Sequence, residues 1–348
     1  MKIGIFTDVH WSTTTSILRS KDGKYTTRLN LLIAGMNWAN DLFQKQGCAF
    51  NVCAGDFFDK SSCTDEELSA VKEVVWKQPT LFIVGNHESS RAGLEVSSTK
   101  ALANDNTVGG LESNIIEKPT VLETDTHQLY FVPYVVESDR KPLKEYLPFW
   151  NPNKKHIIFS HNDLRDVQYG AYLNTTGFSL SEIEEVADLY LNGHIHNGQW
   201  ITEKILNLGS MTAQNFTNDS TVYKYGVWIL DTDTLKLEFF ENPYSLNFYK
   251  FDINKKKDMD ALDTLKSNSI LSIKCYEPLK DELKLKLLAK SNVLLSRITY
   301  FNDIVVEDGE ECTLVKSDHL EQFKNYILEN LGTTNIIKEE LNEVCRWN

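Results

Sequence analysis

The chain has 348 residues, more than one average domain needs, so we expect one large domain and a smaller appendage. Hydrophobic residues make up 41% and charged residues 24%, which is ordinary for a globular protein and excludes wholesale disorder. Asp and Glu number 49 against 36 Lys and Arg, and this net charge of −13 excludes a protein that holds nucleic acid by a basic surface alone.

The six cysteines form no Cys-x-x-Cys pair, which disfavours a zinc knuckle or a redox dithiol. The first apolar stretch becomes polar after six residues, which is too short for a signal peptide. No segment reaches the roughly 20 apolar residues of a membrane span. We therefore expect a protein of a reducing cytoplasm that makes no use of a membrane.

Short apolar runs alternate with helical patterns along the first half of the chain. Strands are predicted at residues 3–6, 50–54 and 80–84, and helices at residues 29–43 and from a capping box at 64–67 to about 76. Further strands are predicted at residues 129–132, 157–159 and 189–191, and a hairpin at residues 222–240 turns through 231–234. This order predicts an α/β fold in which two sheets pack as a sandwich flanked by helices.

The character of the sequence changes after Tyr249. Lys255, Lys256 and Lys257 are expected to form a solvated connector. A strand, a helix and a strand follow at residues 270–276, 279–291 and 293–301, and two helices at 318–331 and 336–344. The predicted organisation is a main domain at residues 1–249, a small α+β unit at 250–310 and a C-terminal helical segment at 311–348.

Five polar motifs follow predicted strands directly. They are Asp8-Val9-His10, Gly55-Asp56-Phe57-Phe58-Asp59, Gly85-Asn86-His87-Glu88, Ser160-His161 and Gly193-His194-Ile195-His196. Open α/β sheets place their sites beyond the carboxyl ends of the strands, so the five motifs should converge. The loop at residues 162–177 either lines the resulting groove or only covers an edge of the sheet.

The residue types in these motifs predict a pair of metal ions. Asp, Asn and His supply oxygen and imidazole ligands without thiolates, and Asp56 is a short carboxylate able to bridge two ions. Asp8 and His10 alternate along an extended segment, so both reach one ion only if the strand end bends. Two ions about 3.5–4 Å apart can activate a water and clamp a phosphate. Each motif alone is weak, since a single His is more often a satisfied polar residue than a ligand; the ordered combination is specific.

The ordered motifs resemble the calcineurin-like metallophosphoesterase superfamily and, within it, the SbcD nuclease branch, which includes the recombination nuclease subunits of T4-like phages. The stretch at residues 55–59 has the Gly-Asp-x-Phe-Asp form of that branch. Residues 208–212 followed by 225–228 also resemble the phage subunits. The resemblance covers residues 1–245, and beyond them it rests on the order of elements alone.

The resemblance implies a role for each motif residue. Asp8, His10 and His196 would bind one ion; Asn86, His161 and His194 would bind the other; and Asp56 would bridge them. His87 matches the catalytic histidine of the family, and its alternative is a structural hydrogen bond below the site. Asp59 stands where some relatives carry a second catalytic histidine and where bacterial and phage members also use Asp, so it is a second catalytic candidate. Departures from the family pattern are Trp11-Ser12 after the first motif and Glu88 in the third.

Mn²⁺ is the metal that the resemblance implies, although zinc or iron would satisfy the same ligands. Near the motifs, four side chains are candidates for contact with DNA phosphate or for stacking on a base: Trp11, Arg28, Lys60 and Arg91. For each of them the alternative is packing or a solvated charge.

The family resemblance also implies partners. It predicts a DNA exonuclease and single-strand endonuclease that works with an SbcC-type ATPase as a homodimer within a heterotetramer, in a bacterial cytoplasm and in a phage-like setting. Residues 250–310 would be a capping domain, and the stripe Leu320, Phe323, Ile327 and Leu331 would dock on the ATPase or pack on the cap. The rival predictions are a general metallophosphoesterase acting on a small phosphodiester or phosphoprotein, and a non-enzymatic scaffold subunit.

Overall fold

The computed structural model describes residues 1–13, 21–90, 93–105, 107–169, 172–218 and 220–301. The predicted C-terminal helical segment, the last residues of the predicted cap and Arg91 lie outside this part of the chain. Residues 1–301 form one compact unit.

Two six-stranded sheets account for most of the strands. The first sheet contains β1 (Lys2–Phe6), β4 (Phe50–Cys53), β5 (Thr80–Ile83), β8 (Ile115–Ile116), β19 (Gly226–Asp231) and β20 (Lys236–Glu241), in the order β20-β19-β1-β4-β5-β8. The second contains β9 (Thr120–Glu123), β10 (His127–Val132), β11 (Lys155–Ser160), β16 (Leu189–Asn192), β17 (Gln199–Trp200) and β18 (Ile205–Asn207), in the order β17-β18-β16-β11-β10-β9.

Parallel strands occupy the centre of both sheets. In the first, β1, β4, β5 and β8 pair in parallel and β19 and β20 add antiparallel strands at one edge. In the second, β10, β11, β16 and β18 are parallel, and β9 and β17 are antiparallel edges. Parallel strands present their carboxyl ends together, so the loops after β1, β4, β5, β11 and β16 meet at one end of the sandwich.

The α-helices of the described residues are α1 (Thr27–Lys45), α2 (Asp65–Val71), α3 (Leu180–Val186) and α4 (Lys280–Leu288). Five 3-10 turns join other elements: η1 (Ser98–Leu102), η2 (Glu137–Asp139), η3 (Leu143–Tyr146), η4 (Lys256–Thr264) and η5 (Glu277–Leu279). Short ladders pair β2 (Lys21–Asp22) with β3 (Tyr25–Thr26), β6 (Ser89–Ser90) with β7 (Gly93–Ser97), β12 (Leu164–Arg165) with β15 (Phe178–Ser179), and β13 (Gln168–Tyr169) with β14 (Tyr172–Leu173).

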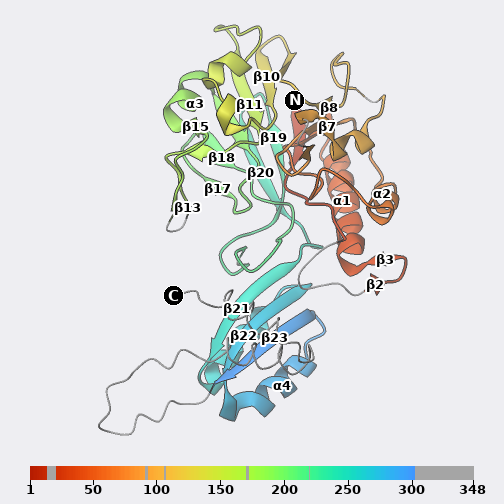
Figure 1. Cartoon of the computed structure of the whole chain (residues 1–348), viewed down its shortest axis with the longest axis vertical. Coiled ribbons are helices and arrows are strands. Elements are labelled where there is room, and N and C mark those ends of the chain that lie inside the picture. The colour runs from red at the N-terminus through yellow and green to blue at the C-terminus, as the bar shows by residue number, and fades with distance from the viewer. Residues whose placement is uncertain (14–20, 91–92, 106, 170–171, 219, 302–348) are drawn as a thin grey trace, which may run out of the picture. The chain divides into compact units, whose positions relative to one another are not determined.

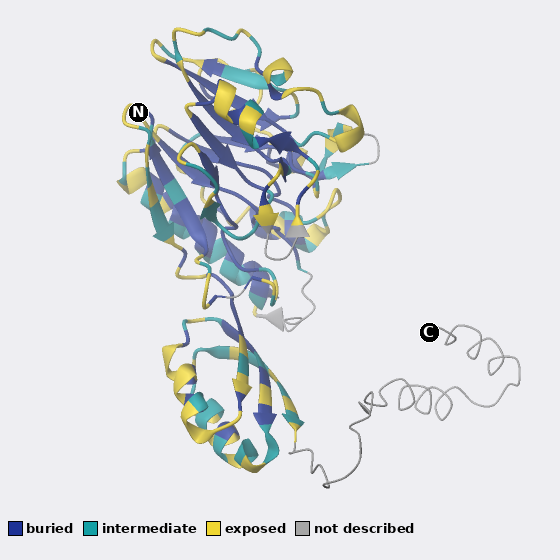
Figure 2. Cartoon of the chain, turned by 90° about the vertical axis from the view of Figure 1, so that its left-hand side faces the viewer, coloured by how far each residue is buried: buried dark blue, intermediate teal, exposed yellow. Residues whose placement is uncertain are grey.

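The two sheets pack face to face, and helices cover their outer faces (Figure 1). Side chains alternate along a strand, so Ile3 and Ile5 of β1 pack between the sheets whereas Phe6 packs toward α1. On the second sheet, Ile157 and Phe159 face the other sheet and Ile158 packs with α3. The central strands of both sheets are therefore buried on both faces (Figure 2), and the predicted α/β sandwich flanked by helices is confirmed.

Two local predictions need correction. The capping box at Thr64 and Glu67 is present, but α2 ends at Val71 and does not reach Trp76. After Lys72 the backbone turns, since the amides of Glu73 and Val74 bond back to Ala70 and Val71, and this turn buries Val74 in the core. Lys256 and Lys257 begin η4, so this part of the predicted connector has regular structure.

A third sheet follows the sandwich. It consists of the parallel strands β21 (Asn247–Ile253), β22 (Ser269–Tyr276) and β23 (Val293–Phe301), with α4 between the last two as predicted. The sequence analysis missed β21, which begins within the predicted main domain. The division at residue 249 remains a prediction. Among the described residues, none of the helices combines the length and apolarity that a membrane crossing requires.

Candidate metal centre

The strand-end motifs adopt an unusual backbone conformation. Asp8, His10, Asp56 and His194 all have positive φ angles, of 50°, 48°, 48° and 74°. L-amino acids seldom adopt this left-handed region, and such strain gathers at functional sites because the surrounding structure must hold it. The bend after β1 turns the side chains of Asp8 and His10 to the same side, as the prediction of a shared ion required.

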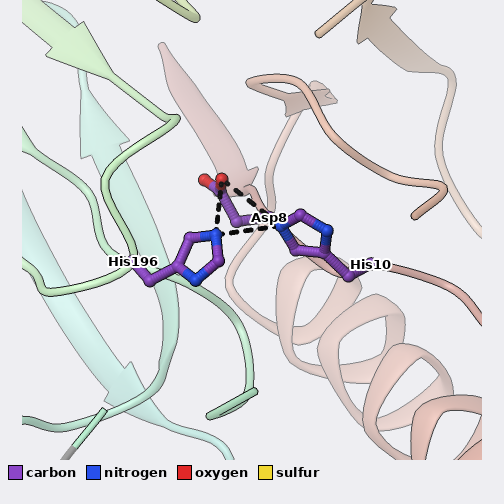
Figure 3. A group of neighbouring side chains, drawn as sticks. All are labelled: Asp8, His10 and His196. Carbon is purple, nitrogen blue, oxygen red and sulfur yellow. Dashed lines mark hydrogen bonds and ion pairs between the residues drawn. The ribbon is translucent and has the colours of Figure 1, made fainter. Parts of the chain in front are cut away.

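Asp8, His10 and His196 form the first cluster, in which the three side chains point toward one another (Figure 3). The Nε2 atoms of His10 and His196 lie 3.0 Å apart, and Asp8 Oδ1 lies 3.9 Å from the first and 3.7 Å from the second. Two ring nitrogens approach this closely only when a proton or a cation lies between their lone pairs.

The two carboxylate oxygens of Asp8 have different surroundings. Asp8 Oδ2 accepts hydrogen bonds from Thr7 Oγ1 at 2.6 Å and from the His194 amide at 3.0 Å. Asp8 Oδ1 is buried without a hydrogen-bond partner among the described residues. An unpaired buried carboxylate oxygen beside two imidazole nitrogens is a suitable donor set for a divalent cation.

Asp56, Asn86, His161 and His194 form the second cluster. Asn86 Oδ1 lies 3.1 Å from His161 Nε2 and 3.0 Å from His194 Nδ1, and Asp56 Oδ2 lies 3.0 Å from His161 Nε2. Amide and carboxylate oxygens are acceptors, so these ring nitrogens face other lone pairs unless they are protonated or share a cation. The donor chemistry therefore fits a second cation.

Asp56 lies between the two clusters. Its Oδ2 is 3.0 Å from His161 and 4.0 Å from His10, whereas its Oδ1 accepts the His87 amide at 3.0 Å. Gly55 makes this position possible, because it has a φ of 101° and an added Cβ would lie 2.1 Å from His161 Nδ1. Asp56 has the position that a bridging ligand needs.

Opposite charges in the clusters shift the pKa values of the histidines. Burial alone would lower the pKa of His10, but its hydrogen bonds to Asp59 and Asp8, with the charge of Asp56, raise it to about 10. Burial also opposes protonation of His161, but the charge and hydrogen bond of Asp56 raise its pKa to about 9. Burial holds the pKa of His196 at about 4, against the charge of Asp8. The raised pKa values of His10 and His161 come from the same negative charges that a bound cation would neutralise.

His87 and Asp59 lie at the open side of the clusters. The side chain of His87 is 42% exposed, and its Nδ1 lies 3.0 Å from the Asp59 carbonyl oxygen, which leaves Nε2 on the far side of the ring. The carboxylate of Asp59 contacts His10 Nδ1 at 3.1 Å and lies 3.9 Å from His87 Nδ1. Asp59 therefore contacts a predicted metal ligand as well as the histidine predicted to act in catalysis.

The side chains proposed for DNA contact lie in different surroundings. Trp11 and Arg28 are buried: the Trp11 indole donates to the Glu67 carbonyl, and Arg28 donates to the His10 carbonyl and to Gln214. Their burial favours packing, which was the alternative, over contact with DNA. Lys60 is exposed on the loop after Asp59, and Arg91 is outside the described residues.

Two residues support the clusters in ways that were not predicted: Glu88, which the sequence placed in the third motif without a role, and Asp163, which was not singled out. Glu88 is buried and accepts the Phe58 and Gly85 amides, so it ties two strand-end loops together; burial raises its pKa to about 7. Asp163 Oδ1 lies 3.2 Å from His194 Nε2. The signal for Asp163 was its place two residues after His161, but an isolated carboxylate in a polar loop does not stand out in a sequence.

Fold and donor set together define a metal-dependent phosphoesterase, and comparison with known families agrees. The chain belongs to the calcineurin-like phosphoesterase family, whose pattern matches residues 1–198. It is similar to the probable exonuclease subunit 1 of Escherichia phage T5, with 24% identity over 308 residues that cover 83% of this chain and 82% of that protein.

Solved structures with a similar arrangement include an archaeal phosphodiesterase, at 13% identity and a TM-score of 0.35, covering 69% of this chain and 99% of that chain. Another is a dimetal phosphatase from Danio rerio, at 14% identity and a TM-score of 0.40, covering 66% of this chain and 91% of that chain.

Proposed function

We propose that the chain is a two-metal DNA nuclease of the SbcD type, the nuclease subunit of an SbcCD-type repair and recombination complex. It would act as an exonuclease on duplex ends and as an endonuclease on single strands. The observation that carries this proposal is the similarity to a phage exonuclease subunit over 83% of this chain, because that alignment extends past the family match, which ends at residue 198.

The ligand assignment is part of the proposal. Asp8, His10 and His196 would hold the first ion; Asn86, His161 and His194 the second; and Asp56 would bridge them. Mn²⁺ is the proposed metal because the family resemblance implies it, and the imidazole and oxygen donors would accept it as they would zinc or iron. When bound, two such ions supply a reactive hydroxide at neutral pH and neutralise charge on the phosphate.

His87 would assist the departure of the leaving oxygen. Its Nδ1 donates to the Asp59 carbonyl oxygen, so Nε2 is the ring nitrogen on the exposed side, and it has a proton to give when the ring is in its imidazolium form. A proton delivered there would neutralise the alkoxide that forms as the phosphodiester bond breaks. The buried Glu88 holds the loops of Phe58 and Gly85 together, and so keeps His87 beside Asp59.

The charge of the chain bears on how DNA would be bound. The net charge is −13, so a polyanion gains little from the protein surface as a whole. The metal ions and a partner subunit would therefore supply the attraction. An SbcC-type ATPase in a heterotetramer with a homodimer of this chain is the proposed partner, and a solution mass equal to one chain at micromolar concentration would contradict a stable dimer.

The decisive experiment compares wild type with His87→Ala in Mn²⁺, with and without the candidate ATPase. The substrates are linear duplex DNA, single-stranded DNA and a small phosphodiester. We expect wild type to cut DNA and His87→Ala to lose cutting while it retains metal. Hydrolysis of the small ester alone, even with the ATPase present, would instead indicate a general metallophosphoesterase. DNA processing that is unchanged in His87→Ala and abolished by removal of the C-terminal helical segment would indicate a scaffold subunit.

A further inference from the structure

His194 has both ring nitrogens in contact with acceptors. Its Nδ1 lies 3.0 Å from Asn86 Oδ1 in the second cluster, and its Nε2 lies 3.2 Å from Asp163 Oδ1 outside that cluster. A neutral imidazole carries one N–H, and a carboxylate accepts a hydrogen bond but does not donate one. The contact with Asp163 therefore favours the tautomer with hydrogen on Nε2, which directs the lone pair of Nδ1 at Asn86.

We propose that Asp163 is a positioning residue for the second metal site: it fixes the tautomer and the ring orientation of His194, so that Nδ1 is ready to bind the cation. The inference rests on the metal centre of the proposed function and adds a residue to it. Partners of this kind on the outer nitrogen of a metal-binding histidine hold the ring and increase its basicity.

A backbone hydrogen bond and a close glycine contact fix the backbone around Asp163. The Asp163 carbonyl accepts the Phe178 amide at 3.0 Å, which pairs the two ends of the loop at residues 162–177. Gly177 allows that approach, since it has a φ of 96° and an added Cβ would lie 2.0 Å from the Asp163 oxygen. The loop therefore does more than cover an edge, because its closure sets the position of a carboxylate at the centre.

A buried amide fixes the same turn from inside. Asn174 is 4% exposed, and its Nδ2 donates to the Leu164 carbonyl at 3.0 Å and to the Thr176 carbonyl at 3.2 Å. The same Nδ2 lies 3.5 Å from Asp163 Oδ1, so it also contacts the carboxylate. Asp163 is thereby held between the loop and the imidazole of His194.

Two other histidines of the centre show the same arrangement with different acceptors. His10 Nδ1 contacts Asp59 Oδ1 at 3.1 Å, and His161 Nδ1 contacts the Ala54 carbonyl at 2.8 Å. In both, the outer nitrogen is held and Nε2 faces the cluster. In His194 the two ring nitrogens have exchanged places, so that Nδ1 faces the cluster and Nε2 lies outside it. The outer Nε2 therefore needs a hydrogen-bond acceptor, and Asp163 is that acceptor.

Titration with Mn²⁺, by calorimetry and electron paramagnetic resonance, tests this role without reference to activity. We expect wild type to bind two ions and to give the spectrum of a coupled pair. Asp163→Ala should bind the second ion about 10–100-fold more weakly and give the spectrum of an isolated ion. Asp163→Asn keeps an acceptor oxygen and should show a smaller loss. The matched control is Asp166→Asn, which removes an exposed carboxylate from the same loop and should bind both ions as wild type does.

Normal binding of both ions by a folded Asp163→Ala chain would overturn the inference, as would a wild-type chain that binds no divalent ion. If Asp163→Ala fails to fold, the isosteric Asp163→Asn variant decides. Weaker binding of the second ion, with an unchanged melting temperature of the metal-free chain, supports the role of Asp163. Unchanged affinity for the second ion overturns it. DNA cleavage is scored separately. A wild type that binds two ions and cuts no DNA defeats the nuclease proposal, and the titration still decides the role of Asp163.

Discussion

The two halves of the candidate centre differ in how they balance charge. The first half contains a carboxylate of its own, since Asp8 lies beside His10 and His196. The second half contains Asn86, His161 and His194, none of which carries a negative charge, and shares Asp56 with the first. A cation in the second half therefore depends on Asp56 for its nearest negative charge. We infer that the second ion binds more weakly and that the halves respond differently to substitution.

Asp56→Asn should have the largest effect. It removes the shared charge and preserves the shape of the side chain, so the second ion should be lost while the first remains on Asp8. Hydrolysis should fall by about a thousandfold, equivalent to about 4 kcal/mol of transition-state stabilisation. Mn²⁺ titration and phosphodiester hydrolysis measure the two effects. Equal loss of both ions would show that the two halves do not bind their ions independently. The control for a lost carboxylate is Asp41→Asn, at an exposed position.

His87→Ala should separate chemistry from metal binding. The side chain is 42% exposed and lies outside the donor sets proposed for the two ions. We expect hydrolysis to fall by about a hundredfold, the low end of the usual contribution of a general acid, with both ions bound as in wild type. Calorimetry and a kinetic assay on the same preparation test this. If His87→Ala binds one ion fewer, His87 is a metal ligand. If the rate of hydrolysis is unchanged, His87 has a structural role.

Asp59→Asn should affect the first half more than the second. The Asp59 carboxylate contacts His10 Nδ1 at 3.1 Å, whereas the contact with His87 at 3.0 Å uses the backbone carbonyl and survives the substitution. The first ion should bind about tenfold more weakly, at the low end for an outer partner because the amide still accepts. Direct Mn²⁺ titration resolves the two sites. A weakened second ion with an intact first would reverse the comparison.

The smallest effect is a dependence on pH in the metal-free chain. The pKa values of His10 and His161 are raised to about 10 and about 9, above the ordinary value of 6.5. Their stabilisation is therefore fully present below pH 6.5 and is lost as pH rises through about 9 and 10. Without metal, the melting temperature should decrease across this range. Mn²⁺ affinity should increase by about tenfold per pH unit for each proton displaced, and a flat pH profile of affinity would contradict these protonation states.

Much of the sandwich was predictable because local patterns and the global fold agree. Strands such as β1 and β16 are apolar runs bounded by turn residues, and the polar motifs at their ends identify the edge where parallel strands converge. The proposed metal ligands could be selected from the sequence for the same reason, since they stand in these strand-end motifs. Short edge strands such as β8 escaped prediction, since two residues carry no period.

The supporting residues could not be predicted in the same way. Asp163 and Glu88 matter through the atoms that they contact, and those contacts join loops far apart in the sequence. The burial of Arg28 could not be predicted either, because a charged residue at the start of a helix usually faces solvent. In the structure its guanidinium is buried and donates a hydrogen bond to the His10 carbonyl. The positive φ angles of Asp8, His10, Asp56 and His194 also could not be predicted from the composition of the sequence.

The pairing of β1 with β19 has a consequence for synthesis on the ribosome. Lys2 pairs with Asp231, so β1 has one neighbour, β19, that is made more than two hundred residues later. Long-range pairing of this kind is slow to form, and an apolar strand that waits with a free edge is exposed to aggregation. We expect the nascent chain to remain open on this side until β19 leaves the exit tunnel, and a ribosome-bound chain stalled before residue 226 should remain sensitive to protease near its N-terminus.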